Sequence, residues 1–92
     1  MALLDLLGRR WCLRILWELR HDRLTFRELQ TAAGNISPTV LNSRLGELRT
    51  AGLVDQVPGD GYGLTPMGHE LLSHLGPLHR FAESWAARLA AP

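Results

Sequence analysis

The stretch from Ile36 to Val54 constrains the fold more than any other part of the chain, because it marks both ends of one helix. Ser37 can cap the helix, and Pro38 suits the first helical position, where proline's fixed φ fits and its missing N–H is not needed. Gly52 follows where helices commonly end in a left-handed residue. An apolar stripe at spacings of four, three and three residues lies between them, formed by Leu41, Leu45, Leu48 and Ala51. The pattern predicts a helix with one buried face.

The opposite face of this helix carries small or hydrogen-bonding side chains and no carboxylate. At about 100° per residue, it contains Thr39, Asn42, Ser43, Gly46 and Thr50. A helix with an apolar back and a neutral, hydrogen-bonding front can lie in a DNA major groove. We therefore treat it as a candidate recognition helix. Gly46 lowers the helix propensity of this segment by about 0.5–1 kcal/mol relative to Ala.

The length of 92 residues, 46% of them hydrophobic and 21% charged, predicts a single globular domain over residues 1–92. Its apolar runs fall short of the roughly 20 residues that cross a bilayer. No signal-peptide pattern is present, so we expect a cytoplasmic protein without a membrane partner. Cys12, the one cysteine, cannot form an internal disulfide.

The net charge is only +1, but the charges are unevenly distributed. Residues 1–50 carry eight Arg and five acids, whereas residues 51–92 carry two Arg and four acids. All the basic residues are Arg, a usage that suits phosphate contacts and equally fits a GC-rich genome. The charge therefore only mildly favours a nucleic-acid partner for the first half of the chain.

Two further helices are predicted before the recognition helix. The first covers about residues 9–20, because Cys12, Ile15, Leu16 and Leu19 recur at helical spacing. Thr25 and Glu28 have the spacing of a capping box, which opens a short helix over about 26–33. Gly34-Asn35 ends it. With the recognition helix, it forms a predicted helix-turn-helix over about residues 26–51.

A β-hairpin is predicted next, over about residues 53–64. Leu53 to Val57 alternates and is rich in β-branched residues, Pro58-Gly59-Asp60-Gly61 is a turn, and Tyr62-Gly63-Leu64 can return as the second strand. Three helices followed by a hairpin is the winged helix-turn-helix plan. The predicted fold class is mainly α with this small hairpin as the wing.

The last helix is predicted over about residues 66–90, with Thr65 as its cap and Pro66 at its first position. Its apolar residues have heptad spacing, which favours a partner helix and so a homodimer. The alternative is that this helix folds back on the chain's own first helix. Pro77 predicts a kink or a break near Gly76-Pro77. The heptad seam consists of Leu71, Leu75, Leu78, Ala82, Trp85 and Leu89.

Several short patterns resemble the HxlR family of bacterial winged helix-turn-helix regulators: Gly8-Arg9-Arg10-Trp11, Ile36-Ser37-Pro38, Gly52-Leu53-Val54, and Tyr62-Gly63-Leu64-Thr65-Pro66-Met67-Gly68. The resemblance implies a homodimer built from the N-terminal segment and the last helix. It further implies binding to a pseudo-palindromic operator, as a repressor or activator that responds to redox stress, electrophiles or small aromatic compounds.

The chain departs from the family pattern at three places. An N-terminal extension, which often carries a sensing cysteine, is almost absent. The wing tip contains Asp60 and no Arg, which weakens the expectation that the wing contacts DNA. Gly46 stands where the family commonly has a long polar residue, so the predicted DNA-reading surface is smaller there.

For DNA contacts, we expect Thr39, Asn42 and Ser43 at base edges. Arg27, Arg44 and Arg49 would hold phosphates, assisted by the helix N-terminus at Ser37 and Pro38. The alternative for Arg44 and Arg49 is a surface ion pair with Glu47 or Glu28.

A small-molecule pocket lined by aromatic residues is a further possibility, since four aromatics occur on the two helices expected at the dimer interface: Trp11, Trp17, Phe81 and Trp85. The alternative is ordinary packing. Cys12 lies on the core stripe, which favours a buried thiol over a redox sensor.

His69 and His74 are five residues apart and so on different helix faces, which excludes the zinc-protease pattern. No pattern predicts a metal, a cofactor or an enzyme. The sequence thus predicts a sequence-specific, DNA-binding transcriptional regulator, a homodimeric repressor responsive to a small molecule or redox signal. The alternative is a winged-helix protein-interaction module without specific DNA binding.

Overall fold

The predicted recognition helix forms with both of its predicted ends. In the computed structural model, which describes residues 2–92, helix α4 runs from Pro38 to Thr50. The Ser37 hydroxyl accepts a hydrogen bond from the Val40 N–H at 3.4 Å. Gly52 follows in the left-handed region, with φ 77°. Leu41, Leu45 and Leu48 of the predicted apolar stripe are buried as expected, whereas its fourth member, Ala51, is exposed and follows the last residue of the helix.

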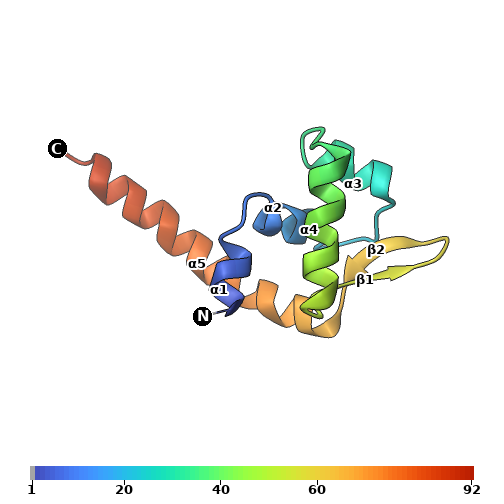
Figure 1. Cartoon of the computed structure of the whole chain (residues 1–92). Coiled ribbons are helices and arrows are strands. Elements are labelled where there is room, and N and C mark those ends of the chain that lie inside the picture. Colours follow the sequence, from blue (N-terminus) through green and yellow to red (C-terminus); the bar gives the residue numbers. More distant parts are fainter. Residues whose placement is uncertain (1) are drawn as a thin grey trace.

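The other elements follow the predicted order (Figure 1). The chain forms α1 (Ala2–Leu7), α2 (Cys12–Glu18), α3 (Phe26–Ala32), α4, β1 (Val54–Val57), β2 (Gly61–Leu64) and α5 (Pro66–Ala90). The fold is therefore mainly α with one small hairpin. Met1 lies outside the described residues.

Helix α2 is shorter than the predicted span of residues 9–20. Trp11 has φ 81°, a left-handed conformation that a helix interior does not contain. The preceding residues therefore form a turn between α1 and α2, and the helix begins only at Cys12. The helical spacing of the apolar residues predicted a start near Arg9. It gives no indication of the left-handed backbone at Trp11.

Helix α3 begins with the predicted capping box. The Glu28 N–H donates to the Thr25 hydroxyl at 3.2 Å, and the Thr25 N–H donates to the Glu28 carboxylate at 2.9 Å. At the other end, Gly34 and Asn35 both have positive φ, 81° and 60°. These two residues reverse the chain between α3 and α4 and confirm the predicted turn of the helix-turn-helix.

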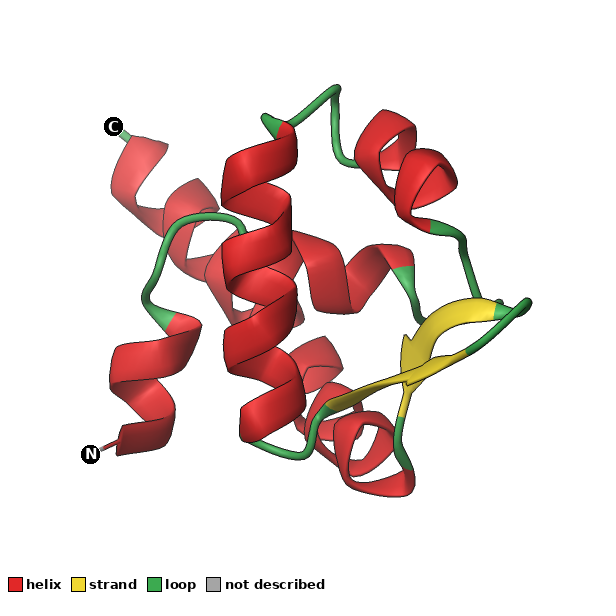
Figure 2. Ribbon diagram, turned by 45° about the vertical axis from the view of Figure 1, so that its right-hand side comes forward, coloured by secondary structure: helices red, strands yellow, loops and turns green. Residues whose placement is uncertain are grey.

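The hairpin pairs β1 with β2 in antiparallel register, from Val54 opposite Leu64 to Val57 opposite Gly61. Figure 2 shows it beside the C-terminal end of α4. An additional bridge joins Leu24 to Tyr62 and ties the loop before α3 to the wing. Sequence reasoning missed this bridge, because a single residue pair has no periodic pattern.

One hydrophobic core joins the three helices of the body to the hairpin. α2 contributes Cys12, Ile15 and Leu16, and α4 contributes its leucine stripe. Leu29 from α3 and Leu53, Val54, Tyr62 and Leu64 from the hairpin region complete the buried set with Leu19, Ala33 and Ile36. This core fixes α4 by its apolar face and leaves the opposite face open.

Helix α5 is continuous through Gly76 and Pro77, so of the predicted kink or break the break does not occur. A proline removes one backbone hydrogen bond, which an exposed helix can lose without ending. Figure 1 shows the first turns of α5 against the body and the remainder projecting away from it at a changed direction. Leu71 and Leu72 pack on the core, whereas every residue from Pro77 to Pro92 is exposed. Packing on the chain's own body therefore accounts for only the first half of this helix.

Candidate nucleic-acid interface

The front of α4 is fully available to a partner. Its polar residues are all exposed, and Gly46 lies at the centre of their face, between Asn42 and Thr50. The remaining members of this exposed set are Thr39, Ser43 and Arg49. Ser37 and Pro38, at the N-terminus of the helix, are exposed as well. These residues present hydroxyl, amide and guanidinium groups with no carboxylate among them.

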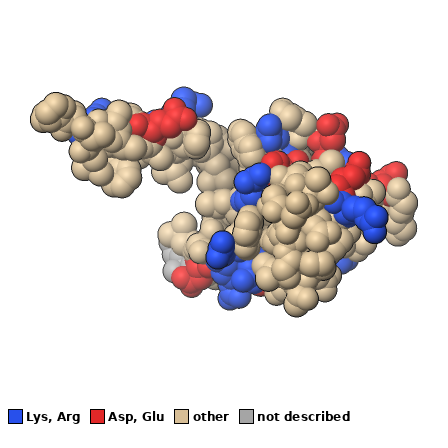
Figure 3. Space-filling view, turned by 90° about the horizontal axis from the view of Figure 1, so that it is seen from above, with Lys and Arg blue, Asp and Glu red and all other residues tan. Residues whose placement is uncertain are grey.

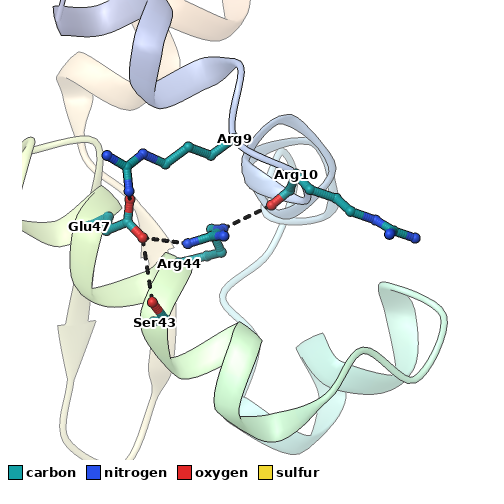
Figure 4. A network of polar contacts seen from close by, with 5 residues as sticks. All are labelled: Arg9, Arg10, Ser43, Arg44 and Glu47. Carbon is teal, nitrogen blue, oxygen red and sulfur yellow. Dashed lines mark hydrogen bonds and ion pairs between the residues drawn. The ribbon is translucent and has the colours of Figure 1, made fainter.

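Arg44 does not share this face. Its Nε donates to the Arg10 carbonyl oxygen at 2.9 Å, and its Nη1 lies 2.5 Å from Glu47 Oε1 (Figure 4). Arg9 pairs with the other oxygen of the Glu47 carboxylate at 2.9 Å, and Ser43 Oγ lies 3.5 Å from Oε1. The alternative expectation, that Arg44 pairs with Glu47, is confirmed. This Arg9–Glu47–Arg44 network attaches α4 to the turn between α1 and α2.

Arg27 and Arg49 are placed differently from Arg44. Both are exposed, and neither forms an ion pair within residues 2–92. Arg27 lies near the start of α3, and Arg49 lies in the last turn of α4. Both guanidinium groups are therefore available for phosphate contacts.

The wing carries a charge pair that sequence reasoning did not anticipate. Arg23 Nη2 lies 2.6 Å from Asp55 Oδ1 and donates to the Gly61 carbonyl oxygen at 2.9 Å. A Cβ at Gly63 would lie 2.5 Å from the Arg23 guanidinium, so this glycine makes room for the pair. The Arg23 guanidinium thus offsets the charge of the Asp55 carboxylate, which would otherwise repel DNA phosphates. The tip of the wing, Pro58 to Asp60, still has no Arg.

An open groove runs between the second half of α4 and β1. It is lined by Gly46, Arg49, Thr50, Val54, Asp55 and Gln56. Sequence reasoning missed Gln56, because only the hairpin packing brings it beside α4. Figure 3 shows that, on the face in view, arginines are scattered over the body with acids between them, without a continuous basic face.

Cys12 is fully buried. Burial, followed by the nearby Glu47 carboxylate, raises the pKa of its thiol above the ordinary value. Burial confirms the expected position of Cys12 in the core, and a thiol with a raised pKa contains less of the reactive thiolate.

The expected aromatic residues do not come together in one pocket. Trp17 lines an apolar cleft of about 550 Å³ between α2 and α5, with Leu13, Leu72, Leu75 and Leu78 among its neighbours. Trp11, Phe81 and Trp85 are not part of its lining. Phe81 and Trp85 lie on the projecting part of α5 and are more than half exposed. The single chain thus has a cleft with one aromatic wall.

Within the described residues, no three His, Cys, Asp or Glu side chains are grouped as metal ligands. His79 instead pairs with Glu83 at 2.9 Å on the surface of α5. None of the helices in residues 2–92 is both long and apolar enough to cross a membrane.

A helix-turn-helix with an open recognition face, followed by a hairpin wing, defines a DNA-binding transcriptional regulator of the winged helix-turn-helix class. Residues 6–90 match the HxlR-like helix-turn-helix family, and the chain belongs to this family. The members of this family are transcriptional regulators rather than enzymes.

Individual relatives agree with this assignment. The chain is 34% identical over 87 residues to YvaP, an uncharacterized HTH-type transcriptional regulator of Bacillus subtilis (strain 168), covering 88% of this chain and 81% of YvaP. It resembles the crystal structure of quinone-bound YodB from B. subtilis with a TM-score of 0.84 and 28% identity, covering 90% and 92% of the two chains. A possible HxlR family transcriptional factor from Thermoplasma volcanium gives a TM-score of 0.82 and 27% identity, covering 95% and 84%.

Proposed function

We propose that this regulator is a homodimeric repressor that binds a pseudo-palindromic operator with one α4 from each protomer. The observation that carries the dimer is the apolar surface of α5 beyond Pro77. Leu78 is 58% exposed, Trp85 53% and Leu89 68%, on a helix that leaves the body. Exposed apolar area of this kind marks a protein contact, and pairing with a second copy would bury it. Two recognition helices would then be held at one spacing.

The contacts to DNA divide between base edges and phosphates. Asn42 can pair bidentately with adenine, while Thr39 and Ser43 offer hydroxyls to either donor or acceptor groups. Arg27, Arg49 and the N-terminus of α4 at Ser37 and Pro38 are proposed to hold the backbone. Arg44 contributes indirectly, because its network with Glu47 orients α4 from behind.

The cleft between α2 and α5 is the proposed effector site. Its walls are apolar, and Trp17 offers one aromatic face for stacking with a small aromatic compound. YodB, which this chain resembles, has been solved with a quinone bound. An occupant of this cleft would push on α5 and so alter the spacing of the two α4 helices. Quenching of tryptophan fluorescence by a phenolic or quinone compound, absent in Trp17→Ala, would support this site.

DNA binding is tested by gel shift with the DNA flanking the protein's own gene and with an unrelated duplex, each at two salt concentrations. The wild-type protein should bind the flanking DNA more tightly. Asn42→Ala should reduce this preference, because it removes a base-edge contact. Arg27→Ala should weaken binding to both duplexes alike and reduce the salt slope by about one per bound protomer.

The absence of a shift at low salt would contradict the proposed function, since even non-specific binding appears there. It would favour a winged-helix protein-interaction module instead. An unchanged salt slope for Arg27→Ala would remove only Arg27 from the phosphate contacts.

A further inference from the structure

Gly46 is a glycine that nothing inside the chain requires. It lies in the middle of α4, and its φ is not in the left-handed region. A Cβ built at this position meets no other atom within 4 Å. Glycine in a helix interior is destabilising relative to alanine, so the position is unfavourable for the helix and neutral for packing. A close approach of another molecule to the helix backbone is one reason for a glycine at such a position.

The surroundings of Gly46 indicate what approaches. The groove is lined by Arg49 and Thr50 from α4 and by Gln56 from β1, whose side chains carry guanidinium, hydroxyl and amide groups. These are the donor groups that proteins use on phosphate oxygens. The floor is the buried Val54.

The electrostatics of the groove suit an anion. Its only carboxylate, on Asp55, is paired with Arg23 at 2.6 Å, so Arg49 sets the net charge. The carbonyl oxygens at the end of α4 would oppose an anion, but three of the last four already accept hydrogen bonds. Those of Glu47, Leu48 and Arg49 accept from the N–H groups of Ala51, Leu53 and Gly52.

We infer that this groove seats one phosphate of the DNA backbone, and that Gly46 is a glycine because the strand passes directly over it. The inference builds on the proposed DNA-binding function and makes it more specific. A methyl group at position 46 would hold the strand away from Arg49 and Gln56. The small central residue of the recognition face is thus a contact point rather than a gap in the surface.

The test compares Gly46→Ala and Gly46→Gln with the wild-type protein by gel shift, on the flanking DNA and on a random duplex of equal length, at two salt concentrations. Phosphate contacts are independent of sequence, so both variants should bind both duplexes about tenfold more weakly for each bound protomer, the size of one lost charge-assisted hydrogen bond. The salt slope should fall by about one per bound protomer.

Two controls separate this effect from misfolding. Gly46→Ala should unfold at or above the wild-type temperature, because alanine favours the helix and meets no neighbour. Arg49→Ala should weaken DNA binding in the wild-type background but add little in the Gly46→Ala background, because both changes remove the same phosphate contact.

Wild-type affinity in Gly46→Ala, or tighter binding by Gly46→Gln, would overturn the inference and leave the DNA-binding function intact. Additive losses for Gly46→Ala and Arg49→Ala would also overturn it. A wild-type protein that binds neither duplex would instead overturn the proposed function, and this inference with it.

Discussion

At the scale of single residues, the glycines of this chain have unlike reasons for being glycine. Gly68, in the first turn of α5, is buried, and a Cβ there would lie 2.1 Å from the carbonyl oxygen of Leu53. That carbonyl also accepts a hydrogen bond from the Thr65 N–H at 3.2 Å, at the cap of α5. The glycine in Thr65-Pro66-Met67-Gly68 therefore lets the start of α5 contact the end of the recognition helix segment.

Gly68→Ala should destabilise the protein by about 1–3 kcal/mol, because the backbone of Leu53 or the start of α5 must move to admit the methyl group. Gly46→Ala is the matched control, since it is the same substitution in an open helical position. It should stabilise the protein by about 0.5–1 kcal/mol. Urea unfolding of both variants measures the two effects. Equal effects of one sign would show that the close approach at Gly68 does not govern stability.

Residue identities alone could not separate these cases. Both glycines occur within helical patterns, and only the packing of the Leu53 carbonyl over Gly68 distinguishes them. The same holds for Arg44 and Arg49. Both side chains project from α4. The Arg44 guanidinium donates to the carbonyl oxygen of Arg10, which is distant in sequence, whereas Arg49 is exposed.

At the scale of elements, local rules predicted most of the helix ends, because caps depend on residues close in sequence. The capping box at Thr25 and Glu28, the start at Ser37-Pro38 and the start at Thr65-Pro66 all appear in the structure. The predicted start of α2 was wrong, because the left-handed backbone conformation of Trp11 depends on the turn between α1 and α2. The isolated bridge between Leu24 and Tyr62 was missed for a similar reason.

The capping box also gives α3 a pH dependence. The N–H and hydroxyl of Thr25 hold the pKa of Glu28 below its ordinary value of 4.5. A carboxyl whose pKa is lower in the folded state stabilises that state above its unfolded pKa, and this stability is lost as the pH falls through the folded pKa. The free energy of unfolding should therefore decrease more steeply below about pH 4.5 in the wild-type protein than in Glu28→Gln.

Urea unfolding of both proteins between neutral and acidic pH tests this expectation. Glu70→Gln is a suitable control, because Glu70 forms no ion pair among residues 2–92. Parallel curves for the wild-type protein and Glu28→Gln would show that the box does not stabilise α3.

At the scale of the whole molecule, the heptad spacing on α5 indicated a surface that the single chain leaves uncovered. Only the second part of this heptad surface is uncovered in the single chain. Leu71 is partly buried on the body, whereas Leu78, Trp85 and Leu89 are exposed. The molecule extends 52 × 26 × 24 Å, largely because of this projecting helix. The heptad spacing in the sequence could not show where along α5 the contact with the body ends.

Leu78→Asp should convert the proposed dimer to a monomer, because it places a charge in the apolar pairing surface. Light scattering at micromolar concentration measures the mass, and circular dichroism checks that the helices remain. Arg88→Ala, an exposed change on the same helix, should leave the mass unchanged. A monomeric wild-type protein at this concentration would contradict the proposed dimer.

The Arg9–Glu47–Arg44 network has a consequence for the choice of binding site. It joins the recognition helix to the rest of the body by ion pairs in addition to apolar packing. Each protomer of the proposed dimer therefore holds its α4 in one orientation. Adding one base pair between two half-sites rotates them by about 35° relative to each other. Two recognition helices in fixed orientations cannot both follow that rotation, so the length of the central spacer would restrict the usable operators in addition to the bases.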